Sequence, residues 1–145
     1  MIHYLALLVL LIFGSLSLLH LYWAFGRRGV TFAAIPTRPD GTPTMNPGLA
    51  PSLVVAALLA AAAFLVGESG GWWEPLLPRM VSLIGTAGVA VVMALRGIGD
   101  FNYVGLFKRH RDSAFARNDT RYFTPLVLLL AALTASVAIL GRSTQ

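Results

Sequence analysis

The sequence contains no cysteine. That absence excludes disulfide bonds, thiol catalysis, iron–sulfur ligation and zinc sites built on cysteine. Charge is also scarce, because only 12% of the 145 residues are Asp, Glu, Lys or Arg. Four stretches hold none of these four residue types: residues 1–26, 41–67, 80–95 and 122–141. This composition excludes a soluble enzyme, a nucleic-acid reader and a disordered chain.

The uncharged stretches point to membrane spans, since about 20 apolar residues cross a bilayer core. The chain is 57% apolar, with a mean hydropathy of +0.73. We therefore predict a single all-α domain over residues 1–145, an integral membrane four-helix bundle with both termini on the outer side. The predicted spans are residues 4–25, 51–66, 79–99 and 123–140, and we expect Gly67 to end the second of them.

Positive charge gathers in two of the three predicted loops. Residues 26–50 hold three Lys or Arg residues and residues 100–122 hold five, of eleven in the chain. Loops that stay in the cytoplasm carry an excess of these residues. We therefore predict a multi-pass protein with both of these loops in the cytoplasm.

The first loop has a proline every three or four residues, at positions 36, 39, 43, 47 and 51. A helix cannot hold that pattern, so we expect an extended or polyproline-type segment. Two roles stay open for it, a lid over a cytoplasmic mouth or a stiff linker.

A histidine and two aromatic residues stand near the end of the first span: His20, Tyr22 and Trp23. At the helical rise, His20 lies about 10 Å from Arg27, just inside the predicted cytoplasmic interface. Ionisable side chains in a span usually face the protein interior or a wet cavity. His20 is therefore a candidate for proton transfer, and Tyr22 and Trp23 for substrate binding. The structural alternative is a single interhelical hydrogen bond from His20.

The end of the third span carries a second group of polar residues. Arg96 and Asp100 are four residues apart, so they can pair on a helix. Asp100 is the carboxylate nearest the membrane and our candidate general acid or base. Arg96, Asn102 and Tyr103 are candidate substrate-binding residues. A salt-bridged helix end would explain the same residues without a substrate.

Cations and aromatic residues alternate along residues 105–122. Such a loop can lie on an anionic leaflet, at about 1 kcal/mol per basic residue. It can instead recognise a phosphate or carboxylate through Arg. Arg109 and Asp119 are therefore further candidate binding residues, and Asp119-Thr120 can alternatively cap the last span. The three histidines are too scattered for a metal site, and we expect neither a metal nor a cofactor.

Several motifs occur in the order found in one family. They are His20-x-Tyr22-Trp23-Ala24-x-Gly26, Asp100-Phe101, Gly105-x-Phe107-Lys108, Phe115-Ala116, Asp119-Thr120 and Phe123-Thr124-Pro125-Leu126. Over nearly its whole length the chain resembles a family of small bacterial four-span membrane proteins of unknown function. Arg27 stands where the resemblance leads us to expect a second glycine. The resemblance implies the four-span fold and a bacterial inner membrane, and it implies no activity.

All candidate residues fall at or near the predicted cytoplasmic interface. We therefore expect a pocket there for a lipid-like or amphiphilic small molecule, which is bound or acted on by proton transfer. Two other functions stay open, a non-catalytic subunit of a membrane complex and a homo-oligomeric transporter. The expected partners are membrane lipid, the amphiphile, and a second copy or a membrane-protein partner, but no nucleic acid. Whether the protein is an enzyme stays open.

Overall fold

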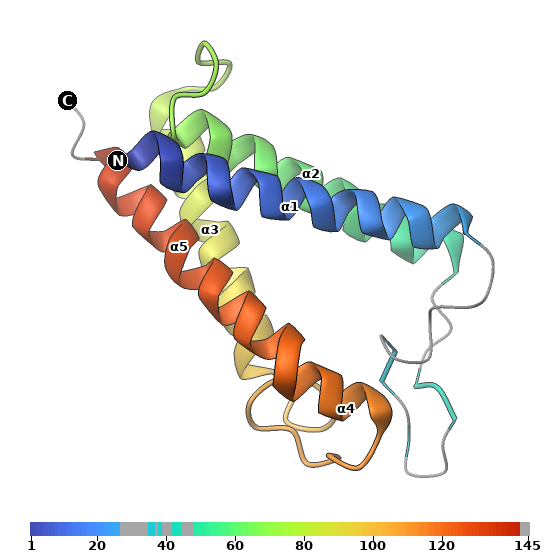
Figure 1. Cartoon of the computed structure of the whole chain (residues 1–145). Coiled ribbons are helices and arrows are strands. Elements are labelled where there is room, and N and C mark those ends of the chain that lie inside the picture. The colour runs from blue at the N-terminus through green and yellow to red at the C-terminus, as the bar shows by residue number, and fades with distance from the viewer. Residues whose placement is uncertain (27–34, 37, 39–41, 45–47, 143–145) are drawn as a thin grey trace.

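The computed structural model describes residues 1–26, 35–36, 38, 42–44 and 48–142. This part of the chain is helical (Figure 1). Its elements are α1 (Ile2–Phe25), α2 (Leu49–Ser69), α3 (Arg79–Ile98), α4 (Ala114–Asn118), the π-helical turn η1 (Asp119–Phe123) and α5 (Thr124–Arg142). Among the described residues, four helices are long and apolar enough to cross a membrane, the last being the continuous segment Ala114–Arg142.

The last membrane helix begins earlier than the sequence predicts. Its first turn is capped by Ser113, whose Oγ accepts a hydrogen bond from the N–H of Ala116 at 3.0 Å. Asp119 and Thr120 therefore lie inside a continuous helix and do not cap it. Thr120 instead donates to the carbonyl of Ala116 at 3.0 Å.

Helix α2 also runs past its predicted end, through Gly67 to Ser69. We expected Gly67 to end the helix, but it serves close packing. A Cβ at Gly67 would lie 2.1 Å from the ring of Trp73. The helix therefore carries Glu68 with it, and this carboxylate belongs to a membrane helix rather than to a loop.

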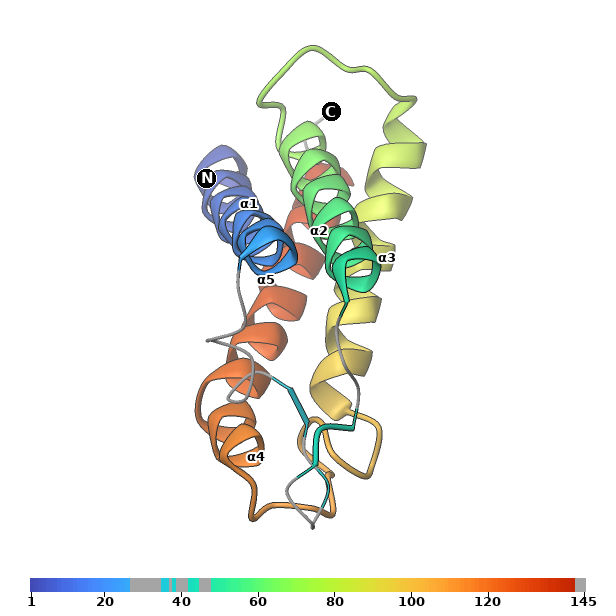
Figure 2. The ribbon, with the colours of Figure 1, turned by 90° about the vertical axis from the view of Figure 1, so that its right-hand side faces the viewer.

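The helices form two hairpins that meet at one end of the molecule and diverge toward the other (Figures 1 and 2). α1 packs mainly against α2, and α3 packs mainly against α5. The start of α1 and the end of α5 lie together where the hairpins meet. The hairpins share one buried core: Ala6, Val9, Phe13, Leu59, Ala62, Val66, Leu130 and Val137.

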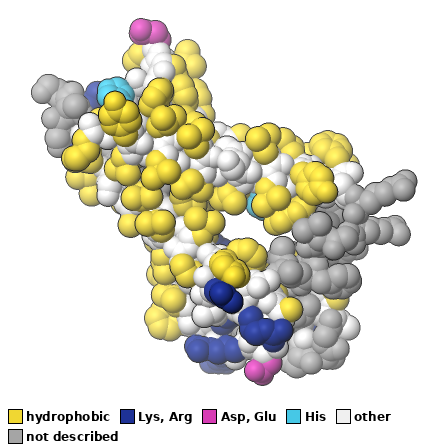
Figure 3. Space-filling view, in the orientation of Figure 1, with side chains coloured by type: hydrophobic (Ala, Val, Ile, Leu, Met, Phe, Trp, Pro, Cys, Tyr) yellow, Lys and Arg dark blue, Asp and Glu magenta, His cyan; other side chains and the backbone are white. Residues whose placement is uncertain are grey.

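Large apolar side chains cover the outside of the helices (Figure 3). Leu18 is 67% exposed, Leu58 65%, Ile84 64% and Ile139 63%. A water-soluble monomer rarely exposes so much continuous apolar surface. In a bilayer these side chains face lipid, so the exterior agrees with a membrane four-helix bundle.

Small polar side chains hold the helices together inside. The Ser17 hydroxyl of α1 donates to the carbonyl of Ala56 in α2 at 2.8 Å. On α3, Ser82, Thr86 and Ala90 are buried. These small residues recur every four positions and pack within the chain, where close approach replaces apolar burial as the source of stability in lipid.

Candidate functional site

A fully buried carboxylate, Asp119, joins the last membrane helix to the end of α3. Its Oδ1 accepts a hydrogen bond from Arg96 Nη2 at 3.0 Å. Its Oδ2 accepts from Lys108 Nζ at 2.9 Å, from the N–H of Gly105 at 2.9 Å and from the hydroxyl of Thr124 at 3.0 Å. One side chain therefore fastens α3, the loop of residues 99–113 and the start of α5 to one another.

The lysine of this cluster is almost as buried as the aspartate. The Lys108 side chain is 2% exposed, and its Nζ also donates to the carbonyl of Gly105 at 3.1 Å. A buried ion pair offsets its desolvation only when further hydrogen bonds satisfy both charges. Asp119 and Lys108 meet that condition. Arg96 is 34% exposed in its side chain, and its buried Nη1 has no hydrogen-bond partner in the described part of the chain.

The loop of residues 99–113 folds back onto the end of α3. Backbone hydrogen bonds run from Leu106 N–H to the Gly97 carbonyl at 2.9 Å and from Asp100 N–H to the Val104 carbonyl at 3.2 Å. Gly99 and Gly105 have φ values of 97° and 86°, a backbone conformation that residues other than glycine rarely adopt. These two glycines therefore permit the reversal that brings Lys108 to Asp119.

Asp100 does not pair with Arg96 as the sequence suggested. α3 ends at Ile98 and the chain turns at Gly99. Asp100 therefore lies outside the helix, and the helical spacing that would bring it beside Arg96 does not hold. Its Oδ1 instead accepts the N–H groups of Asn102, Tyr103 and Val104 at 2.9, 2.7 and 2.9 Å. Partial burial raises the pKa of Asp100, but these N–H groups outweigh it and hold the pKa below the ordinary 3.8. A general acid at neutral pH needs a raised pKa, so this geometry favours a loop-stabilising role.

We predict a pH dependence for Asp100 with a defined sign. Because its folded-state pKa is lowered, its ionised form stabilises the fold above the ordinary pKa of 3.8, and that contribution is lost as the pH falls through the folded value. The difference in melting temperature between wild type and Asp100→Asn should therefore shrink in acid. A difference that stays constant from neutral pH to strong acid would contradict this.

Other predicted binding residues also hold the loop together. The Asn102 carbonyl accepts the N–H groups of Arg109 and His110 at 3.1 and 2.9 Å. The Tyr103 ring stacks on His110 at a centroid distance of 4.7 Å. The Arg109 side chain is exposed. The structure thus brings Arg96 to Asp119 and leaves Asn102, Tyr103 and Arg109 in the surrounding loop.

His20 and Trp23 lie at the far end of α1, where the hairpins diverge. Two turns separate His20 from the buried Phe13, and two turns separate Trp23 from Leu16, which packs against the core. Both side chains therefore continue the inward face of α1. Their rings meet edge to face at 5.0 Å, and His20 Nδ1 lies 2.8 Å from the Leu16 carbonyl. Tyr22 is 63% exposed and points elsewhere.

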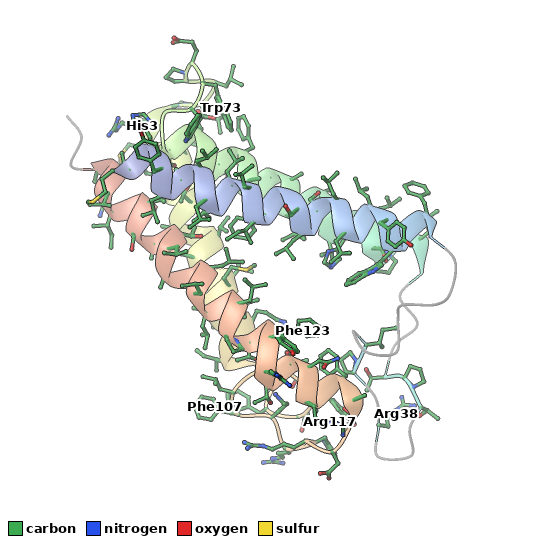
Figure 4. The ribbon with its side chains drawn as sticks, in the orientation of Figure 1. His3, Arg38, Trp73, Phe107, Arg117 and Phe123 are labelled. Atoms are coloured by element: carbon green, nitrogen blue, oxygen red, sulfur yellow. The ribbon has the colours of Figure 1, made fainter. Side chains whose placement is uncertain are left out.

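Phe123 faces the same space from the other hairpin. Figure 4 shows its side chain directed from the start of the long C-terminal helix toward α1. The ring also packs against Phe115 at 6.1 Å. Figure 3 shows the surface hollowed between the two hairpins at this point. We call this end of the molecule, with residues 99–123 and the end of α1, the basic end.

A family model described as "Protein of unknown function (DUF3995)" matches residues 13–134. The chain belongs to this family. No curated protein and no solved structure matches the chain. The matched range includes every candidate site residue named from the sequence, and the family description assigns none of them a role.

Two functional candidates in this family member escaped the sequence analysis. In the sequence Lys108 resembles the other loop cations, and its place in the Gly105-x-Phe107-Lys108 motif is the signal that distinguishes it. Glu68 lies just beyond the predicted second span, and its signal is that it directly follows the uncharged stretch 41–67. Both are buried in the structure, at 4% and 9% exposure.

Some predictions concern residues that the structure does not describe. Four residues of the first predicted loop lie outside the described residues: Arg27, Arg28, Pro39 and Pro47. In the described part of this loop, Thr44 N–H and hydroxyl both bond to the Pro36 carbonyl at 2.8 Å. The choice between lid and linker stays a prediction. Among the described residues, no three His, Asp or Glu side chains gather as a metal-ligand set.

Proposed function

We propose that this membrane protein binds an amphiphilic small molecule with an acidic head group at its basic end. The observation that carries the proposal is a pair of buried donors without partners. Trp23 Nε1 and Arg96 Nη1 both lie at this end, and neither finds an acceptor among the described residues. An unmet buried donor costs about 1–3 kcal/mol, and an acidic head group supplies acceptor oxygens.

The divergence of the hairpins supports an apolar tail for the ligand. The inward face of α1 continues past the core to Trp23, and Phe123 faces it from the other hairpin. Pockets for small molecules are typically apolar with a few placed polar groups. The Trp23 indole and the Phe123 ring fit that description, and an alkyl chain would lie between the hairpins.

The surrounding charge supports an acidic head. Figure 3 shows Lys and Arg side chains gathered at this end of the molecule. Four arginines of this end are exposed: Arg109, Arg111, Arg117 and Arg121. Such a field concentrates anions at the site. By the positive-inside rule, we place this end on the cytoplasmic side of a bacterial inner membrane. The His20 ring meets the Trp23 ring at 5.0 Å, and His20 would carry any proton transfer.

Quenching of Trp23 fluorescence tests the proposal. The ligand is a brominated long-chain fatty acid added to the protein in mild detergent, with the methyl ester of the same acid as the neutral control. We expect the acid to quench Trp23 fluorescence saturably, and the ester to quench it markedly less. Trp23→Phe removes the reporter and leaves Trp72 and Trp73 at the other end, so the saturable phase should disappear.

A matched pair of arginine variants identifies the head-group contact. Arg96→Gln should weaken binding of the fatty acid by about tenfold, as expected for the loss of a charge-assisted hydrogen bond. Arg111→Gln, an exposed cation of the same loop, should bind nearly as wild type does. Equal quenching by acid and ester, or persistence of the saturable phase in Trp23→Phe, would contradict the proposal.

A further inference from the structure

A second pocket, with a few polar groups in largely apolar walls, lies at the opposite end of the bundle, where the hairpins meet. Its volume is about 370 Å³, and its walls include Glu68 and Ser69 from α2, Trp73 from the loop, Arg79 from α3, and His3 from α1. Figure 4 shows His3 and Trp73 on neighbouring segments at this end. None of the residues that line this pocket belongs to the basic end, so the pocket is independent of the proposed amphiphile site.

Glu68 gives the pocket its chemistry. Its residue is 9% exposed, and its Oε1 accepts the N–H of Leu77 at 2.7 Å and the hydroxyl of Ser82 at 3.0 Å. Its Oε2 is buried and has no hydrogen-bond partner in the part of the chain that the structure describes. A buried carboxylate oxygen without a donor is costly, so the site is complete only when a ligand supplies one.

The same pocket offers donors of its own. Trp73 Nε1 is buried and without an acceptor among the described residues. Arg79 lines the pocket, donates to the Gly141 carbonyl, and is otherwise exposed. The pocket thus combines one carboxylate with one guanidinium and one indole N–H. A ligand that meets all three carries a cationic donor and an anionic acceptor on the same small frame.

We propose that this pocket binds a primary ammonium–phosphate zwitterion, the phosphoethanolamine group. A primary ammonium has three N–H donors for Glu68 Oε2. A phosphate matches Arg and accepts from an indole N–H. The pocket sits where α2 ends and α3 begins, at the level where spans meet lipid head groups. The group therefore reaches the pocket either as a free molecule or as the head of a phospholipid.

The ammonium hydrogens provide a sharp test on the wild-type protein. Phosphocholine has the same charges but no N–H donor. We expect radiolabelled phosphoethanolamine to bind the detergent-solubilised protein in equilibrium dialysis, and phosphocholine to compete at least about tenfold less well. In nanodiscs, phosphatidylethanolamine should protect Trp73 from aqueous acrylamide quenching more than phosphatidylcholine does.

Matched variants connect the binding to Glu68. Glu68→Gln keeps the shape of the side chain and should weaken the binding of phosphoethanolamine by at least about tenfold. Glu74→Gln, which changes an exposed acid in the loop that follows α2, should leave binding unchanged. A preference for the ethanolamine compound over the choline compound in both dialysis and nanodiscs supports a free ligand. The same preference in nanodiscs alone supports the lipid head group. Equal treatment of ethanolamine and choline compounds in both formats overturns the proposal, whatever the folding of Glu68→Gln.

Discussion

Asp119→Ala is expected to lower the free energy of unfolding by about 3–5 kcal/mol, the cost of breaking a buried ion pair from one side. Lys108, with 2% of its side chain exposed, would lose its anionic partner. Gly105 N–H and the Thr124 hydroxyl would lose their acceptor as well. The measurement is reversible unfolding in mixed micelles, followed by circular dichroism.

Two further variants separate charge from shape in this cluster. Asp119→Asn keeps an acceptor but removes the charge, so its free energy of unfolding should lie between those of wild type and Asp119→Ala. Asp112→Ala removes an exposed carboxylate from the loop of residues 99–113 and should change the free energy of unfolding by less than about 0.5 kcal/mol. A loss of under about 1 kcal/mol for Asp119→Ala would show that this cluster does not hold the basic end together.

Gly99→Ala is expected to cost about 2–3 kcal/mol, because alanine is strained at this backbone conformation and meets another backbone group. Gly99 has a φ of 97°, and a Cβ there would lie 1.7 Å from the Val104 carbonyl oxygen. The loop would have to open to relieve that contact, and Lys108 would leave Asp119 with it. The same unfolding measurement applies.

Gly88→Ala is the matched control for this prediction. A Cβ at Gly88 meets nothing within 4 Å, and the residue lies inside α3. Alanine is the better helix former by about 1 kcal/mol, so this variant should be as stable as wild type or more stable. If Gly99→Ala and Gly88→Ala behaved alike, the loop geometry described above would be incorrect.

The membrane helices could be predicted because charge and apolar length report directly on the bilayer. Their ends were harder, since glycine serves two purposes. Gly67 suggested a helix end, but it makes room for the ring of Trp73, a contact that depends on where the loop folds. Ser113 caps the last helix, but the sequence does not reveal this because the charged residues after it are typical of a loop.

The site was only partly predictable because its contacts are distant in sequence. Arg96 was paired with Asp100 by helical spacing, but its partner Asp119 is 23 residues away. No periodic pattern shows that the chain reverses at Gly99 and Gly105. Trp23 stands at a span end in the sequence, but only the divergence of the hairpins leaves its Nε1 without an acceptor among the described residues.

Native mass spectrometry tests the central claim most directly. The protein, released from mild detergent, is mixed with palmitic acid or with the alcohol of the same chain length. Binding of an acidic amphiphile at the basic end predicts a one-to-one adduct with the acid, a weaker adduct with the alcohol, and loss of the preference in Arg96→Gln but not in Arg111→Gln. Equal adducts with acid and alcohol, or none with either, would contradict it.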